Sequence, residues 1–142
     1  MNTESNTGSR SAHERGSKSA LIIGLDPELL DFSSPEFAAF PGINATKIME
    51  GLNSAVEGMK VLGYDAYHCL TDFGQTAEEV VSARLQQQHF DCVLIGAGVR
   101  TVPSHFILFE KLINVVHKHA PGSKICFNTK PSDTLEALQR WI

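Results

Sequence analysis

Residues 90–106 read Phe90-Asp-Cys-Val-Leu-Ile-Gly-Ala-Gly-Val-Arg-Thr-Val-Pro-Ser-His-Phe106, and this stretch contains the strongest structural signal in the chain. A short apolar run is followed by two glycines and an arginine, and a long apolar segment with helical periodicity begins soon afterwards. That order is typical of a buried strand leading into a helix of a parallel α/β sheet. Backbone N–H groups at a helix start are unpaired and lie at the positive end of the helix dipole. We therefore expect this junction to bind an anion.

The rest of the chain repeats this strand–helix alternation. Predicted strands cover 20–25, 65–70, 91–95 and 124–128, and predicted helices cover 44–62, 103–120 and 132–142. A further helix is predicted to open at Thr76-Ala-Glu-Glu79, which has the pattern of a capping box. Such alternation predicts a parallel sheet with right-handed crossovers. We expect an α/β protein with a three-layer (αβα) sandwich, whose four-stranded parallel sheet has the order 2-1-3-4 of flavodoxin-like and Rossmann-like folds.

Composition and charge narrow the functional classes. The formal net charge is −4 and no concentrated basic face is visible, so nucleic-acid binding is not expected. Residues 1–18 are rich in Ser, Asn, Gly and charge, which predicts a disordered tail ahead of a single α/β domain over 19–142. The tail lacks the apolar core of a secretory signal, and we expect no membrane-spanning segment. Arg10, Arg15 and Lys18 keep an organelle-targeting alternative open, although Glu4 and Glu14 count against it.

The cysteine pattern favours a reducing environment. Cys69, Cys92 and Cys126 all fall within predicted strands, and no C-x-x-C motif occurs among them. An odd number of cysteines in such positions is typical of reduced thiols that pack as small apolar side chains. Because thiols of this kind persist in reducing compartments, we predict a cytoplasmic location.

Arg100 is the predicted anion-binding side chain, because a guanidinium keeps its charge and grips phosphate or carboxylate through two parallel hydrogen bonds. Gly96 and Gly98 would let a ligand approach the main chain. The predicted strand order places this loop at the reversal of the chain, where ligands of open α/β sheets bind. Alternatively, both glycines serve a tight turn and Arg100 pairs with a surface carboxylate. The expected ligand-binding residues are Gly96, Gly98, Val99, Arg100, Thr101, Ser104, Asn128 and Thr129.

Asp26 and His105 are the predicted acid–base residues. Asp26 ends the first strand and should meet the 96–101 loop, where it would orient a hydroxyl, abstract a proton or hold a metal. Alternatively, it caps the turn that Pro27 begins. His105 lies on the predicted sheet-facing side of its helix and titrates near neutral pH, which suits acid or base chemistry. A structural role for this histidine and a capping role for Ser104 are the alternatives.

No cofactor follows from these motifs. Gly96-Ala-Gly98-Val-Arg-Thr101 has threonine at the third glycine position of a dinucleotide fingerprint and follows the third strand rather than the first, so a nicotinamide or flavin dinucleotide is not expected. His117 and His119 are two residues apart on a predicted helix and point to nearly opposite sides, so no metal site is predicted.

The 26–43 segment is long and apolar for a strand-to-helix connection. Its apolar residues are Leu29, Leu30, Phe32, Phe37, Phe40 and Ile43. A loop of this kind should cover either the ligand crevice or another subunit. An arginine–phosphate contact of about 1.5–3 kcal/mol and a helix end of about 0.3–1 kcal/mol support only roughly millimolar binding, so we favour a lid. Phe106, Ile107 and Val115 lie off the sheet side of the 103–120 helix and keep a homodimer open as well.

The alternating pattern resembles the flavodoxin and response-regulator receiver architecture, with one strand–helix unit fewer. Gly96 stands where a receiver has its phosphoryl-accepting aspartate, so the resemblance implies the architecture alone. Gly98-Val-Arg-Thr101, Phe109-Glu-Lys-Leu-Ile-Asn114 and Cys126-Phe-Asn-Thr129 also resemble a family of small single-domain α/β proteins over 20–142. That second resemblance implies no activity.

Together these observations predict a small α/β protein that binds a phosphorylated or carboxylated metabolite beneath the 26–43 segment. Arg100 and the 98–101 backbone would hold the anion at the carboxyl ends of strands one and three, while Asp26 and His105 would act on the rest of the ligand. The competing hypothesis is a non-catalytic regulatory or assembly domain that uses the 26–43 segment and the 103–120 helix as contact surfaces. The sequence leaves open whether the protein is an enzyme.

Overall fold

Four parallel strands form one sheet in the order β2-β1-β3-β4, which confirms the predicted order. The computed structural model describes residues 17–142, and the strands within them are β1 (Ser19–Leu25), β2 (Asp65–Thr71), β3 (Cys92–Ile95) and β4 (Lys124–Phe127). β1 pairs with β2 over its whole length and with β3 from Ala20 to Ile23. β2 and β3 therefore lie on opposite sides of β1, so the direction in which strands are added to the sheet reverses there, as predicted from the alternation of elements.

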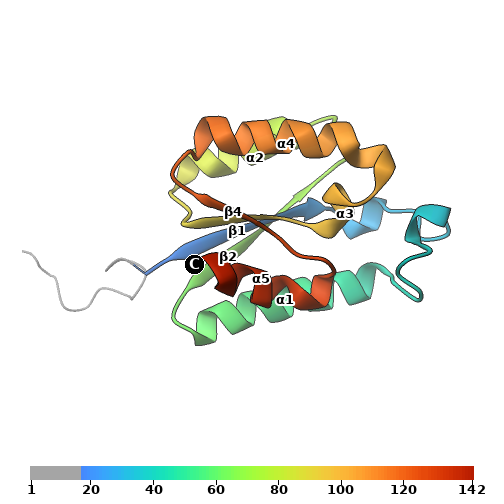
Figure 1. Ribbon diagram of the computed structural model, residues 1–142, viewed down its shortest axis with the longest axis horizontal. Coiled ribbons are helices and arrows are strands. Elements are labelled where there is room, and N and C mark those ends of the chain that lie inside the picture. The colour runs from blue at the N-terminus through green and yellow to red at the C-terminus, as the bar shows by residue number, and fades with distance from the viewer. Residues whose placement is uncertain (1–16) are drawn as a thin grey trace, which may run out of the picture.

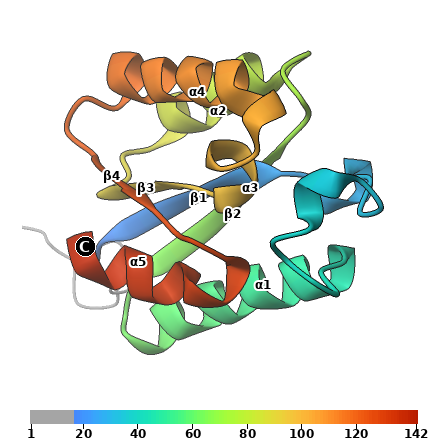
Figure 2. The same ribbon diagram turned by 45° about the vertical axis from the view of Figure 1, so that its right-hand side comes forward.

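Helices cover both faces of this sheet (Figures 1 and 2). α1 (Ala45–Val61) and α5 (Thr134–Trp141) lie on one face, whereas α2 (Ala77–Gln87) and α4 (Phe106–His119) lie on the other. A four-residue helix that was not predicted, α3 (Ala97–Arg100), follows β3 directly. The arrangement is a three-layer α/β fold of the flavodoxin- or Rossmann-like type. Among residues 17–142, no helix has the length and apolar character needed to cross a bilayer.

The two central strands are buried on both faces. Leu21 and Ile23 of β1 pack in the cluster with α2 and α4, while Ala20 and Ile22 pack in the cluster with α1 and α5. All four residues of β3 are buried as well. A parallel strand in this position has apolar side chains on both faces, which explains the continuous apolar runs in the sequence.

The three cysteines are free and buried. Cys92 and Cys126 come from the neighbouring strands β3 and β4, and their Sγ atoms lie 3.3 Å apart. The hydrogen bond between these thiols lowers the pKa of Cys92 and raises that of Cys126. They are part of the core beneath α1 and α5.

The start of α2 differs from the sequence-based expectation. The capping box at Thr76 is wrong, because the Thr76 side chain makes no cap hydrogen bond to α2. Instead, the Asp72 carboxylate accepts from the Thr76 N–H and hydroxyl.

The predicted disordered tail lies outside the described residues, apart from Ser17 and Lys18. Both of these make hydrogen bonds: the Ser17 hydroxyl donates to Gly63 O and Lys18 Nζ donates to Ile142 O.

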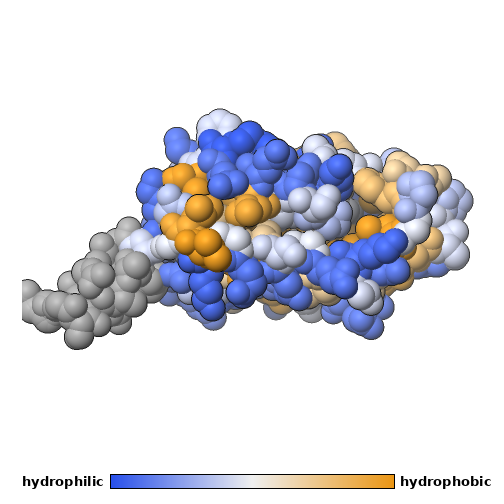
Figure 3. All heavy atoms as spheres, turned by 90° about the horizontal axis from the view of Figure 1, so that it is seen from below, coloured by the Kyte–Doolittle hydropathy of each residue, from blue (hydrophilic) through white to orange (hydrophobic). Residues whose placement is uncertain are grey.

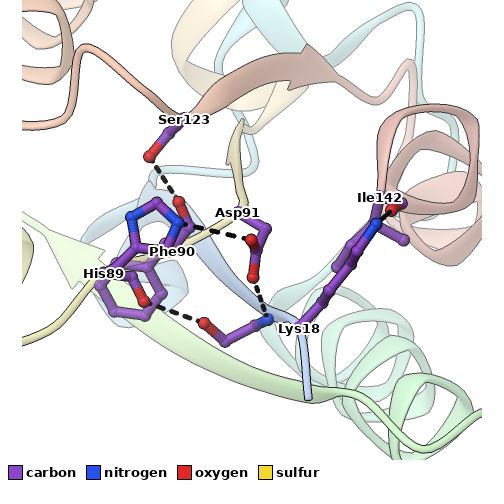
Figure 4. A network of polar contacts seen from close by, with 7 residues as sticks. Lys18, His89, Phe90, Asp91, Ser123 and Ile142 are labelled. Atoms are coloured by element: carbon purple, nitrogen blue, oxygen red, sulfur yellow. Dashed lines mark hydrogen bonds and ion pairs between the residues drawn. The ribbon is translucent and has the colours of Figure 1, made fainter. Parts of the chain in front are cut away.

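Polar contacts join the strands at the amino edge of the sheet (Figure 4). The Asp91 carboxylate accepts from the Ser19 N–H at 2.9 Å and lies 3.4 Å from His89 Nε2. The Ser19 hydroxyl donates to His89 O, and the Ser123 hydroxyl donates to Phe90 O. Because this cluster holds chain segments together at the edge opposite the strand exits, we assign it a structural role.

The Asp91 carboxylate should therefore contribute to folding stability. Asp91→Ala leaves the N–H of Ser19, a residue that is 3% exposed, without its acceptor, and should lower the free energy of unfolding by about 1–3 kcal/mol. Asp91→Asn retains an acceptor oxygen and should cost less. Urea denaturation of the three proteins measures both differences, and equal losses in the two variants would contradict the assigned contact.

Candidate functional site

A narrow crevice lies where the chain reverses, at the carboxyl ends of β1 and β3. Its volume is about 80 Å³, and its walls include Gly24, Leu25, Gly96, Gly98 and Asn128. Gly24 leaves space here, because a Cβ built on it would meet no other heavy atom within 4 Å. The remaining lining is apolar and comes from β1, α1, the 26–43 segment and residues 97, 102 and 131. Ligands of open α/β sheets bind at such reversals.

The 26–43 segment covers this crevice. It contains two 3-10 turns, Pro27–Leu29 and Pro35–Phe37, and its residues Leu30, Phe37, Phe40 and Ile43 line the space beneath it. The segment stands out at one end of the molecule between the two helical layers (Figure 2). The Phe32 and Phe37 rings pack with their centroids 5.0 Å apart. The Ser104 hydroxyl donates to the Glu36 carboxylate, so Ser104 fastens the segment to the chain just ahead of α4.

A wider and more polar groove adjoins the crevice. It has a volume of about 630 Å³ and lies between the 26–43 segment, the first half of α1 and the connection from β4 to α5. Lys47, Glu50 and Lys130 are its charged residues. Phe40, Ile43 and Pro131 line both the groove and the crevice, so the two spaces are adjacent.

Close packing of α1 against the β4–α5 connection shapes the groove. A Cβ built on Gly51 would lie 2.8 Å from the Cβ of Pro131, so only glycine fits there without movement. This contact brings Lys47 on α1 and Lys130 after β4 to the same groove. Sequence reasoning gave neither lysine a role in the site, because their proximity depends on helix packing.

The predicted anion-binding side chain, Arg100, is not among the residues that line the crevice. Its Nη2 donates to Asn128 O at 2.9 Å, and its guanidinium carbon lies 5.5 Å from the centre of the Phe127 ring. Arg100 Nε is buried and has no hydrogen-bond partner among the described residues. These contacts lie on the β4 side of β3. The guanidinium therefore braces the end of β4, whose following residue, Asn128, forms a wall of the crevice.

Asn128 uses its buried amide to join two helix starts. Its Oδ1 accepts from the Ala97 N–H at 2.7 Å, and its Nδ2 donates to Thr134 Oγ1 at 2.9 Å. The first N–H of α3 is therefore taken by a side chain. In the 98–101 backbone, which was expected to hold an anion, the N–H groups of residues 99–101 donate to Gly96 O and Ala97 O. Gly98 is exposed, and a Cβ on it would meet nothing within 4 Å.

The other predicted ligand-binding residues also have partners inside the protein. Val99 is fully buried, and the Thr101 hydroxyl donates to Ala97 O. The Thr129 N–H and hydroxyl both donate to the Asp133 carboxylate. Burial opposes ionisation of Asp133, but the hydrogen bonds from Thr129 and Lys130 and the charge of Lys130 outweigh it and lower the pKa of Asp133.

Asp26 and His105, the predicted acid–base residues, lie apart from the crevice lining. The Asp26 N–H donates to Thr71 O at the end of β2, and its carboxylate accepts from the Glu28 N–H at 3.0 Å. His105 is 8% exposed, lies 2.8 Å through Nδ1 from Gly98 O and packs against the Phe73 ring. No hydrogen bond or ion pair within residues 17–142 joins Asp26, His105 or Arg100 to one another. The Asp26 carboxylate is therefore held within its own turn, whereas the Arg100 guanidinium is held at the end of β4.

Of the predicted ligand-binding residues, the crevice brings together Gly96, Gly98 and Asn128. It adds Gly24, which sequence reasoning did not single out. The sequence did contain a signal for Gly24, which is the next-to-last residue of a buried apolar strand. A glycine there leaves a gap in a face of the strand that is otherwise filled by core side chains. No protein-family description matches this chain, and no curated protein matches it significantly.

The contacts of Arg100 predict a stability role that can be measured. Arg100→Ala removes the hydrogen bond to Asn128 O and the contact with the Phe127 ring, and should lower the free energy of unfolding by about 1–2 kcal/mol. Arg100→Lys keeps the positive charge but lacks the planar donor group, so we expect an intermediate loss. Urea denaturation checks both values. Unchanged stability of the alanine variant would mean that the guanidinium is not held against β4.

Proposed function

We propose that this protein binds a small anionic ligand at the carboxyl ends of β1 and β3, beneath the 26–43 segment. The observation that carries the proposal is the pair of adjacent spaces at the chain reversal, one narrow and apolar, the other wide and flanked by Lys47 and Lys130. The groove of about 630 Å³ lies within the usual range of small-molecule sites, which is about 300–1,000 Å³.

The absence of a side chain at Gly24 supports this location. Its neighbours on the same face of β1, Ala20 and Ile22, are closely packed core residues with at most 1% exposure. At Gly24 the same face opens into the crevice. A gap at the end of a central strand costs packing energy, so a bound ligand is a physical reason for leaving it open.

The geometry supports binding more strongly than catalysis. Asp26 and His105 make contacts that fit a turn cap and a core histidine, and neither lines the crevice or the groove. Among the described residues, no group of three or more His, Cys, Asp or Glu side chains is arranged to hold a metal ion. Because the three cysteines are free, we place the binding activity in the reducing cytoplasm.

Filling the crevice provides the test. Gly24→Val adds a β-branched side chain that suits a strand and projects into the open space, so the melting temperature should stay the same or rise. Thermal shift of the wild-type chain with phosphate, pyrophosphate, citrate, glycerol phosphate and octanoate identifies the anions that stabilise it. The valine variant should lose that ligand-induced shift.

Gly122→Val is the matched control, because a Cβ on Gly122 also meets nothing within 4 Å and the residue lies before β4, at the opposite edge of the sheet. This variant should respond to the same anions as the wild type. The proposal fails if no anion in the panel stabilises the wild-type chain, or if Gly24→Val keeps the full shift.

Self-association is a second candidate function. Phe106 and Ile107 on α4 are 60% and 57% exposed, and Phe73 nearby is 40% exposed. Exposed apolar side chains at neighbouring positions favour a contact surface. If α4 forms a homodimer, sedimentation should show a dimer of the wild-type chain and a monomer of Phe106→Ser. A monomer at every concentration of the wild type would exclude this candidate.

A further inference from the structure

We infer, on the basis of the ligand binding proposed above, that the ligand is an amphiphilic monoanion. Its anionic group would lie in the groove between Lys47 and Lys130, and its apolar body would pass beside Phe40 and Ile43 into the crevice at Gly24. Carboxylates with a short hydrocarbon chain have this chemistry.

The two lysines provide the positive charge. They lie on different elements, α1 and the β4–α5 connection, and both line the groove. Neither ammonium group forms an ion pair or hydrogen bond with another residue in the described part of the chain. Lys47 Nζ folds back over the turn before α1, where it lies 3.3 Å from the position of a Cβ on Gly42. Both cations are therefore available to an anion in the groove, with Lys130 also attracted to the nearby Asp133 carboxylate.

The net charge of the groove favours a single negative charge on the ligand. Glu50 lines the same space and offsets one of the two lysines. The Asp133 carboxylate next to Lys130 does not line the groove and accepts from the Thr129 and Lys130 N–H groups, but it keeps its charge, and the charge of Lys130 helps to lower its pKa. A ligand with several negative charges would face repulsion from Glu50 and from nearby Asp133, so a single negative charge suits the groove best.

The crevice favours a hydrocarbon body. Among residues 17–142, Asn128 is the one polar side chain that lines it, and that amide already bonds Ala97 and Thr134. A polar group placed beside Leu25, Ile48 and Leu52 would lose its hydrogen bonds to water, and no side chain there would offer new ones in their place. An alkyl chain loses none, and its burial is favourable in proportion to the area covered.

The two environments are close enough for one molecule to occupy both. Phe40, Ile43 and Pro131 belong to the linings of the groove and the crevice alike. Figure 3 shows hydrophobic and hydrophilic surfaces side by side at the end of the molecule formed by the 26–43 segment. A molecule with one charged and one apolar end therefore matches the site in both of its parts.

Calorimetric titration of the full chain with five probes tests this inference. Octanoate has both parts of the expected ligand, octanol lacks the charge, acetate lacks the chain, octanedioate carries charge at both ends, and inorganic phosphate is a polar anion. We expect octanoate to bind about tenfold more tightly than any of the other four, since each lacks one matched feature.

Charge variants locate the anionic group. Lys47→Gln and Lys130→Gln should each weaken octanoate binding about threefold, and the double variant about tenfold, while octanol binding stays unchanged. Lys60→Gln, on the same helix as Lys47 and outside the groove, is the matched control and should bind as the wild type does. Ser54→Trp should block the groove, whereas Glu57→Trp, exposed on α1 outside the groove, should not.

The outcomes separate the two proposals. If phosphate or citrate binds, Gly24→Val abolishes that binding, and octanoate does not bind, the proposed anion site is supported and the amphiphilic ligand is excluded. Octanoate affinity that is unchanged by Lys47→Gln, Lys130→Gln and Ser54→Trp would also overturn the inference. If no anion binds at all, the proposed function itself fails.

Discussion

Burial of the two central strands on both faces is the constraint on which the rest of the structure depends. β1 and β3 are apolar almost throughout, so helices have to cover both faces of the sheet. Because the strands are parallel, each connection between them runs over one of these faces. Parallel strands connected in this way end at the same edge, and the chain reverses there between β1 and β3. The crevice, the groove and the covering 26–43 segment all lie at that edge as a consequence.

One buried amide stabilises the shape of this edge. Asn128 accepts from the start of α3 and donates to the start of α5, and its backbone oxygen accepts from Arg100. Since a buried amide without partners is costly, these elements keep fixed positions relative to β4. Residues expected to hold an anion thus form the wall of the site, and the free positive charge in the groove comes from Lys47 and Lys130.

The part of the candidate site that lies close behind the strand ends could be read from the sequence. Gly96, Gly98 and Asn128 line the crevice because parallel strands all end at one edge. The directions of longer side chains were not predictable, since Asp26 finds its partner in its own turn and Arg100 finds one at the end of β4. The capping box at Thr76 was wrong because the carboxylate of Asp72, four residues earlier, accepts from the Thr76 N–H, the group that the Glu79 side chain would bind in a capping box.

The amino-acid sequence by itself determined the layers, the strand order and the edge at which the strands end together. Apolar periodicity is a local property, and right-handed crossovers leave few topologies for this order of elements. Only the tertiary structure decided that Gly24 lines one space and that Lys47 and Lys130 line the adjacent one. Their proximity depends on how closely α1 approaches the β4–α5 connection, where Gly51 packs against Pro131 at a distance that no side chain would permit.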